Sequence, residues 1–263
     1  MHNSLFSFIM RCAGLFMILE ADKAVLLCAR RSYDSNVAYV DPAQLEHVNF
    51  LEKISIPRGK RDGRDIFDYE TAVREFIEET GTFFESAWVF RVPFVLQWND
   101  AGVTYKYAIY VGVVKGLLYH VSREPNTYCV KLNCDKPNDY KFNLEVRRYN
   151  NEIPRYLYIL PLQDYFQYMN EKQLTTYDSS NYLEFFEFVK SVKSKFDRHN
   201  LNKFFLLTLK LDTFNFYHTW INERNNNNNS GGGSSSSNKS SHHHHHNTIL
   251  ASTKDLKKII NVV

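Results

Sequence analysis

The stretch PRGKRDGRDIFDYETAVREFIEETG, residues 57–81, carries strong helix start and stop signals. Asp68 is a favourable N-cap residue and Gly81 suits the position just past a helix end, so residues 69–80 are predicted to form a helix of about three turns. At about 100° per residue, one face of this helix is apolar and should pack against a core. That face consists of Ala72, Val73, Phe76, Ile77 and Thr80.

The opposite face of the same helix carries Glu75, Glu78 and Glu79. Most glutamate clusters on surface helices are solvated faces, and three glutamates alone favour that interpretation. Such helices usually intersperse lysines as i,i+4 partners, however, whereas here only Arg74 is near. This excess of negative charge should raise the pKa of at least one carboxyl group unless a cation relieves the repulsion. Oxygen ligands with incomplete coordination suit Mg²⁺ or Mn²⁺, which can also take up substrate phosphate oxygens.

The order of residues around these glutamates resembles the Nudix box, whose family form is G-x5-E-x7-R-E-U-x-E-E-x-G-U with U bulky and apolar. Gly59 and the run R-E-F-I-E-E-T-G, from Arg74 to Gly81, match it. The first half departs from the pattern, because Asp65 replaces a glutamate and eight residues instead of seven then precede Arg74. Thr82 also replaces the final apolar residue. These departures leave the three glutamates in place.

Further segments extend the resemblance over residues 11–162. IPRGK, residues 56–60, is similar to the PKGK sequence before the box in mRNA-decapping Nudix enzymes of eukaryotes and large DNA viruses. NEIPRYLYILPL, residues 151–162, resembles their E-I-x-x-I-x-W segment, which often supplies a further catalytic glutamate. That residue would be Glu152, with Glu145 as the substitute. Together with RCAGLFMI, LLCARRSY and KISIPRGK, these segments resemble baculovirus Nudix hydrolases of the ADP-ribose pyrophosphatase kind.

The resemblance implies an α/β fold, the Nudix α/β/α sandwich with a mixed β-sheet, and hydrolysis of a nucleoside diphosphate linked to another moiety. It also implies that Mg²⁺ or Mn²⁺ bridges the pyrophosphate oxygens and holds the attacking water in line with phosphorus. The implied metal ligands are Glu75, Glu78, Glu79 and Glu152. The implied catalytic residues are Glu78, Glu79, Glu152 and Arg74. The implied phosphate-binding residues are Gly59, Arg58 and Lys60.

The sequence is compatible with three functions, which are ADP-ribose hydrolysis, mRNA decapping and nucleotide or RNA binding without turnover. Of these we expect ADP-ribose hydrolysis. That reaction needs a compact adenine and ribose pocket, whereas an mRNA-decapping enzyme needs a basic track for capped RNA. A binding module without turnover would account for the altered loop at Asp65, although the intact R-E-F-I-E-E-T-G run opposes it. Four cations before the helix favour decapping and are expected to be partly solvated, with one or two contacting phosphate. They are Arg58, Lys60, Arg61 and Arg64.

The composition bounds the class of protein. A hydrophobic share of 44% with 20 Phe and 17 Tyr excludes a wholly disordered chain, and a net charge of +3 does not indicate a dedicated nucleic-acid binder. Four cysteines without the density of a disulfide framework indicate a reducing compartment, so an intracellular location, host cytoplasm or nucleus, is expected. Arg11 interrupts the apolar N-terminus, which favours a buried hairpin over residues 13–28 rather than a signal peptide or membrane span.

Further periodic segments predict a layered α/β domain. A second hairpin is expected around residues 99–102, where a turn composition separates two runs rich in β-branched and aromatic residues. Short strands are expected near residues 53–56 and at 155–160. A late helix is predicted from helical spacing. The residues with this spacing are Leu183, Phe186, Val189 and Val192.

A change of composition divides the chain into three parts. A Nudix domain with C-terminal helices is predicted for residues 1–222, a low-complexity Asn/Gly/Ser/His linker for 223–247 and a short tail for 248–263. Zinc is not expected at Cys129 and Cys134, because their spacing is poor and a fourth ligand is missing. Four aromatic residues in strand-like runs could stack on a base but are expected in the core. They are Trp88, Trp98, Tyr105 and Tyr107.

Overall fold

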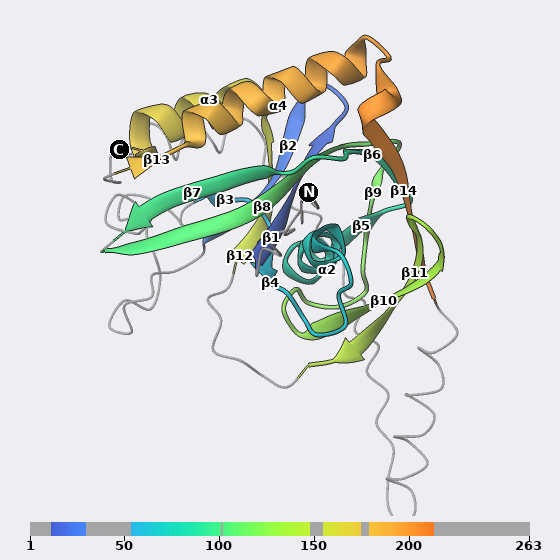
Figure 1. Ribbon diagram of the computed structural model, residues 1–263. Coiled ribbons are helices and arrows are strands. Elements are labelled where there is room, and N and C mark those ends of the chain that lie inside the picture. The colour runs from blue at the N-terminus through green and yellow to red at the C-terminus, as the bar shows by residue number, and fades with distance from the viewer. Residues whose placement is uncertain (1–11, 30–53, 101, 148–154, 175–178, 213–263) are drawn as a thin grey trace, which may run out of the picture.

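The computed structural model of the protein describes residues 12–29, 54–100, 102–147, 155–174 and 179–212 (Figure 1). Glu152, the linker at 223–247 and the tail at 248–263 lie outside the described residues, and the predictions made for them stay predictions. The same holds for the domain boundary at residue 222. Among the described helices, none has the length and apolar character that crossing a membrane requires.

A large mixed sheet forms the centre of the fold. Its strands are β1 (Cys12–Leu19), β2 (Lys23–Ala29), β3 (Ile54–Ser55), β4 (Arg58–Lys60), β6 (Ser86–Phe90), β7 (Phe94–Asp100), β8 (Val103–Val114), β10 (Tyr128–Lys136), β11 (Asp139–Val146), β12 (Arg155–Pro161), β13 (Ser179–Ser180) and β14 (Phe204–Leu211). The main path runs β10-β11-β14-β6-β8-β1-β2-β12. β1 is parallel to β8 and β11 is parallel to β14, while neighbours such as β1 and β2 are antiparallel. The predicted mixed sheet is confirmed.

Smaller elements complete the structure. A separate two-stranded sheet pairs β5 (Thr82–Phe84) with β9 (Leu118–His120). The helices are α2 (Asp68–Thr80), α3 (Leu162–Tyr168), the π-helical turn η2 (Met169–Gln173), α4 (Tyr182–Asp197) and the 3₁₀ turn η4 (Leu201–Lys203). Figure 1 shows α2 on one side of the central strands and α3 and α4 on the other.

The side chains of β1 show why helices cover both faces of the sheet. Successive residues of a strand point to opposite faces. Phe16 and Ile18 pack in one core with residues of α3 and α4, whereas Leu15 and Met17 pack in a second core with residues of α2. All four side chains are fully buried. The expected three-layer α/β/α arrangement is therefore confirmed.

Both predicted hairpins are present. β1 and β2 pair antiparallel through Met17 and Val25, and the turn between them has positive φ at Ala21 and Asp22, as a tight hairpin turn requires. β7 and β8 form the second hairpin, in which Trp98 pairs with Tyr105. The strands predicted near residues 53–56 and at 155–160 correspond to β3 and β12.

The two ends of α2 agree only partly with the prediction. The helix begins at Asp68, so the N-cap position is Phe67 and the prediction of Asp68 as N-cap is wrong. The Glu70 carboxylate accepts the backbone N–H groups of Ile66 (2.5 Å) and Phe67 (3.1 Å), which supplies acceptors at the helix start. Gly81 ends the helix as predicted, with φ of 66° and an N–H donated to a carbonyl of the last turn.

The late helix is confirmed as α4, but one of the four residues that predicted it is misplaced. Phe186, Val189 and Val192 are buried, as the spacing required. Leu183 is 56% exposed, because Tyr182 and Phe185 occupy the buried face of the first turn. The buried face of α4 is therefore rotated slightly about the helix axis from the predicted face, and it includes Tyr182 and Phe185 instead of Leu183.

Candidate active site

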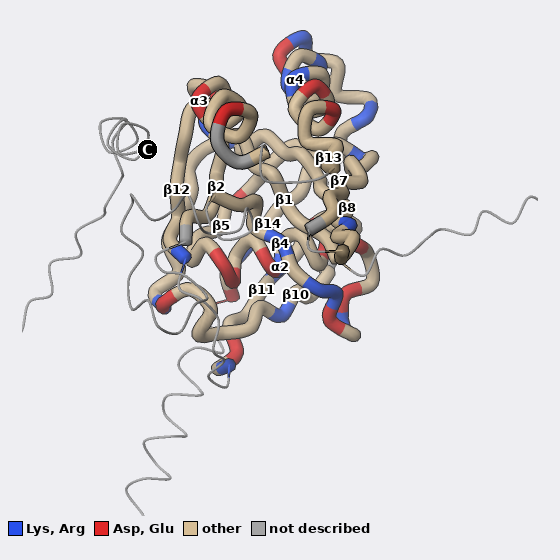
Figure 2. The backbone as a smooth tube through the Cα atoms, turned by 90° about the vertical axis from the view of Figure 1, so that its left-hand side faces the viewer, with Lys and Arg blue, Asp and Glu red and all other residues tan. Residues whose placement is uncertain are grey.

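The second half of α2 brings the three glutamates next to β4 and β10. The predicted apolar face is buried against the sheet, which turns the acidic face toward these strands. Figure 2 shows acidic positions along α2 with basic positions beside them at β4. Glu75 and Glu79 keep side-chain exposures of 15% and 13%, whereas Glu78 is at 5%. The face is thus largely enclosed rather than solvated.

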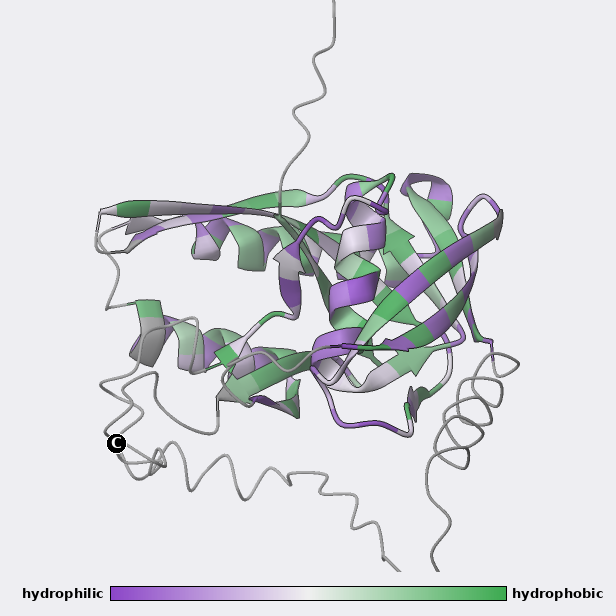
Figure 3. Cartoon of the chain, turned by 90° about the horizontal axis from the view of Figure 1, so that it is seen from below, coloured by the Kyte–Doolittle hydropathy of each residue, from purple (hydrophilic) through white to green (hydrophobic). Residues whose placement is uncertain are grey.

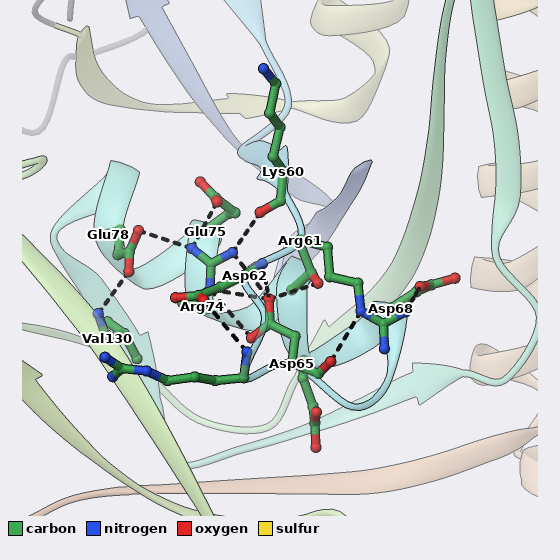
Figure 4. Close-up of polar contacts among 12 residues, drawn as sticks. Lys60, Arg61, Asp62, Asp65, Asp68, Arg74, Glu75, Glu78 and Val130 are labelled. Atoms are coloured by element: carbon green, nitrogen blue, oxygen red, sulfur yellow. Dashed lines mark hydrogen bonds and ion pairs between the residues drawn. The ribbon is translucent and has the colours of Figure 1, made fainter. Parts of the chain in front are cut away.

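Arg74 lies at the centre of this cluster (Figure 4). Its Nη1 donates to Glu75 Oε1 at 2.8 Å and to Glu78 Oε2 at 3.1 Å. Its Nη2 donates to the carbonyl oxygen of Lys60 at 2.7 Å and to Asp65 Oδ2 at 3.1 Å. Burial alone would lower the pKa of Arg74, but Glu75, Glu78 and Asp65 raise it above its ordinary value. One planar guanidinium therefore orients two glutamates and ties them to the preceding loop.

Asp65, to which the sequence assigned no role, organises that loop. Its carboxylate accepts the Thr71 hydroxyl at 2.8 Å and the Asp62 N–H at 3.0 Å in addition to Arg74. Asp65 is 8% exposed, so these donors satisfy a buried charge. The sequence signal was its place six positions after Gly59, where the Nudix pattern has a glutamate. Although the loop departs from the pattern, the Asp65 carboxylate still contacts Arg74.

Glu78 is held from both sides. Oε2 faces Arg74, and Oε1 accepts the Val130 N–H from β10 at 2.7 Å. Burial raises the pKa of Glu78 to about 7, with Arg74 opposing and Glu75 adding to the shift. This carboxyl group can therefore exchange a proton near neutral pH.

Glu79 lies between β4 and β12. Its Oε2 accepts the Arg58 N–H at 2.8 Å, and its Oε1 lies 3.5 Å from Nη1 of Arg155. Burial raises the pKa of Glu79 to about 8; Arg155 opposes this shift and Glu75 adds to it. The pKa values of Glu78 and Glu79 are raised as expected, but burial rather than the expected crowding is the main cause, and the charge of Glu75 adds less.

Gly59 makes room for this arrangement. A Cβ built on Gly59 would overlap the Glu75 carboxylate, so no other residue fits without moving Glu75. Lys60 next to it is exposed. The expectation of a partly solvated Arg58 is wrong, because Arg58 is only 7% exposed. Its guanidinium packs over the rings of Trp98 and Tyr107, and only its backbone N–H meets the glutamates.

The donor set fits Mg²⁺ or Mn²⁺. Three carboxylates on one helix supply the hard oxygen ligands that these ions prefer, and two of them carry raised pKa values that a cation would lower. Within the described parts of the chain, no three His, Cys, Asp or Glu side chains stand ready as a ligand group. In this arrangement Glu75 and Glu79 face Arg74 and Arg155, so a shared ion would have to bind their carboxylates beside these cations.

Other residues singled out by sequence lie elsewhere. Glu145 on β11 forms a surface ion pair with Arg64 at 3.1 Å. Trp98 is 1% exposed and stacks on Tyr105 and Tyr107, each with a centroid distance of 5.4 Å, which confirms its place in the core. None of the four cysteines forms a disulfide bond. Arg155 is the functional candidate that sequence reasoning missed, since only folding brings β12 to α2.

Comparison with known proteins finds relatives but no matching protein-family profile. The "Protein ADP-ribose pyrophosphatase ORF38" of Autographa californica nuclear polyhedrosis virus is 62% identical over 199 residues, covering 75% of this chain and 91% of that protein. The "Uncharacterized 24.3 kDa protein" of Orgyia pseudotsugata multicapsid polyhedrosis virus is 58% identical over 198 residues, with the same coverages. A solved NUDIX hydrolase from Nitrosomonas europaea gives a TM-score of 0.32 at 18% identity, covering 62% of this chain and 78% of that chain.

Proposed function

This chain belongs to the family of baculovirus Nudix hydrolases that includes its Autographa californica relative, and from that premise we propose that it hydrolyses the pyrophosphate of ADP-ribose. The name of that relative supports the substrate. The observation that carries the proposal is the cluster of Glu75, Glu78 and Glu79, in which the Glu75 carboxylate packs against the backbone of Gly59. Water would add to one phosphorus and the P–O–P bond would break, giving AMP and ribose 5-phosphate.

The reaction would depend on Mg²⁺ or Mn²⁺. The ligands would be Glu75, Glu78 and Glu79, joined by Glu152 from outside the described residues. When bound, such an ion supplies positive charge for the phosphate oxygens and makes a water more acidic. Arg74 keeps Glu75 and Glu78 in position, and the Arg58 N–H does the same for Glu79.

The remaining groups would bind substrate and move a proton. A bound cation would lower the pKa values of Glu78 and Glu79 from about 7 and about 8, so both carboxylates would be deprotonated at neutral pH and either could accept the proton that the attacking water loses. The missing side chain of Gly59 leaves room for the Glu75 carboxylate, which would bind the ion. The exposed ammonium of Lys60 would attract the diphosphate.

The test compares the wild type with Glu79→Gln in Mg²⁺ and in Mn²⁺. Removing one carboxylate charge should lower kcat/KM for ADP-ribose by at least about 100-fold, because developing charge on the phosphates loses its support. Glu187→Gln is the matched control, since Glu187 lies exposed on α4 in a surface pair with Lys190. Full activity of a folded Glu79→Gln protein would refute the assignment of the site.

Removal of the 5′ cap from mRNA is the second candidate. It is favoured by cations around the substrate side of the box, where Lys60 is exposed and the Arg64 side chain is 60% exposed. Cap-labelled RNA should therefore be offered in parallel with ADP-ribose. Cleavage of capped RNA at far lower enzyme concentration would make decapping the function. No turnover of either substrate by the wild type would favour a nucleotide-binding module.

A further inference from the structure

A groove lies between α3 and α4, on the side of the sheet away from α2 (Figure 1). Its volume is about 760 Å³, within the range of protein pockets that bind ligands. Phe166 of α3 and Phe186 of α4 line it with ring centroids 4.5 Å apart, and Phe166 is only half-buried. Leu183, also in the lining, is 56% exposed. Apolar surface therefore faces solvent between the two helices.

The same groove is acidic along α4. Glu184 and Glu187 line it and are exposed, and the lining contains one cation, Lys190. Lys190 Nζ lies 2.7 Å from Glu187 Oε1, but the two side chains are 56% and 71% exposed, so water screens the pair and a second cation can approach Glu187. The α3 side contributes uncharged amides such as Gln167. The groove therefore suits an apolar segment that carries positive charge at its border.

The chain contains a segment with these properties in KDLKKIINVV, residues 254–263, called the tail segment below. Three lysines and one aspartate give it a net positive charge. Ten residues are too few for a stable helix in water, so a helix here would need a surface that covers its apolar face. Its apolar residues have the i, i+3, i+4, i+7 spacing of one helix face, the pattern by which short helices bind in grooves. They are Leu256, Ile259, Ile260 and Val263.

The chain between β14 and the tail segment is long enough to bring the two surfaces together. It comprises residues 213–253 and includes the predicted linker at 223–247. A flexible chain of this length would span about 35 Å on average, which is roughly the diameter of a domain of this size. Such a tether would hold the tail segment near the domain at a concentration on the order of 1 mM. Even a weak contact would then be occupied within one molecule.

We propose that the tail segment docks in the groove between α3 and α4 of its own chain, as a short helix. Its apolar face would cover Phe166, Leu183 and Phe186. Its lysines would face Glu184 and Glu187, with Lys257 next to the apolar face. The groove lies across the sheet from the glutamates of α2, so this docking goes beyond the proposed function and does not depend on it.

The experiment uses full-length protein in which the photo-cross-linker p-benzoyl-phenylalanine replaces Ile259. After irradiation, gel electrophoresis separates single chains from cross-linked pairs, and mass spectrometry of the single-chain product locates the attached residues. The same cross-linker in place of Ser235, within the predicted linker, measures random collisions with the domain. The cross-linker can react with any nearby C–H bond, so it does not select a partner in advance.

Charge reversal tests the recognition itself. One variant combines Glu184→Lys with Glu187→Lys, a second combines Lys257→Glu with Lys258→Glu, and a third carries all four changes. All four side chains are exposed or lie in the tail segment, so the domain should keep its melting temperature. The matched control combines Glu85→Lys with Glu124→Lys, two exposed glutamates outside the groove.

The cross-linker at 259 should attach to α3 and α4 of the same chain several-fold more often than the one at 235. Each reversed pair should lower this yield several-fold, because like charges then meet across the contact. The variant with all four changes should recover most of the yield, since opposite charges meet again. The control pair should match the unaltered chain.

The same attachment pattern for positions 259 and 235 would overturn the proposal. Attachment mainly to a second chain would overturn it too, because the groove would then bind the tail segment of another copy. Unchanged yield in both reversed pairs, or no recovery with all four changes, would refute recognition by these charges. Failure of the wild type to cleave ADP-ribose would refute only the proposed function, because cross-linking requires no turnover.

Discussion

Arg74 is the single residue on which the arrangement of the acidic face depends. Its guanidinium serves Asp65, Glu75 and Glu78 at once, and it is 8% exposed as a side chain. A lysine at this position carries the charge but only one nitrogen. Arg74→Lys should therefore lower the free energy of unfolding by about 3 kcal/mol, the cost of leaving buried charges partly unpaired. Urea denaturation followed by tryptophan fluorescence would measure it.

Arg64→Lys is the control for that substitution. Arg64 pairs with Glu145 at 3.1 Å, but both side chains are largely exposed. Water screens such a pair, so the denaturation midpoint should not change. Equal loss of stability in Arg64→Lys and Arg74→Lys would contradict a special role for Arg74.

Gly59 gives a second residue-scale prediction. A methyl group on Gly59 would overlap the Glu75 carboxylate, so Gly59→Ala should push Glu75 away from its place beside Arg74. We expect kcat/KM for ADP-ribose to fall by about 100-fold, as small displacements at an active site do. Gly63→Ala is the control, because nothing lies within 4 Å of a Cβ there. An active Gly59→Ala enzyme would show that Glu75 need not stay in position.

At the scale of elements, the apolar face of α2 anchors the site to the sheet. Phe76 is fully buried and packs edge-on against Phe84 of β5, with ring centroids 5.9 Å apart. Phe76→Ala should lower the free energy of unfolding by about 3–5 kcal/mol, from lost burial and the cavity left behind. Leu183→Ala on α4 should change it by less than about 0.5 kcal/mol, because Leu183 is 56% exposed. Thermal and chemical denaturation of both variants would measure these changes and test whether Leu183 lies on the exposed face of α4.

Three strands near α2 were not anticipated from the sequence. Figure 3 shows hydrophobic and hydrophilic bands alternating on β10 and β11 beside α2, and the hydrophilic positions are mostly Lys, Asn and Asp. Such residues are poor strand formers, so the local signal is weak. β14 is then placed between β11 and β6 by pairing with segments far away in sequence. Tertiary pairing overrides local propensity in all three.

For the whole molecule, the buried glutamates make stability depend on pH. Burial raises the pKa values of Glu78 and Glu79 from 4.5 to about 7 and about 8. The folded protein then binds more protons than the unfolded chain, so this contribution is fully present below pH 4.5 and is lost as pH rises through about 8. In EDTA, the wild type should lose more Tm between about pH 5 and about pH 8.5 than Glu79→Gln, whose amide does not titrate. Calorimetry would measure the difference.

Mg²⁺ should reverse this loss. It binds deprotonated carboxylates, so its stabilising effect on the wild type should be largest at the alkaline end and small in Glu79→Gln. Mg²⁺ also has little preference for imidazole, which keeps the His tract out of the measurement. An equal effect of Mg²⁺ at both pH values would argue against binding at these glutamates.

The sequence by itself determined α2 and its apolar face, both hairpins, the Nudix-type run and the three acidic residues. Each of these follows from spacing within a few residues, where helix periodicity, strand alternation and turn chemistry act locally. The sequence also placed Asp65 at the position of a box glutamate, although it left the role of Asp65 open.

Only the tertiary structure decided which distant groups Glu78 and Glu79 contact. Glu79 accepts the backbone N–H of Arg58, 21 residues earlier, and faces the guanidinium of Arg155, 76 residues later. Glu78 accepts the backbone N–H of Val130, 52 residues later. The sequence predicted a partly solvated Arg58, whereas the fold places its guanidinium over Trp98 and Tyr107 of the β7–β8 hairpin. Burial and neighbouring charge set the pKa values of Glu78 and Glu79, and both depend on strands that meet only when the sheet forms.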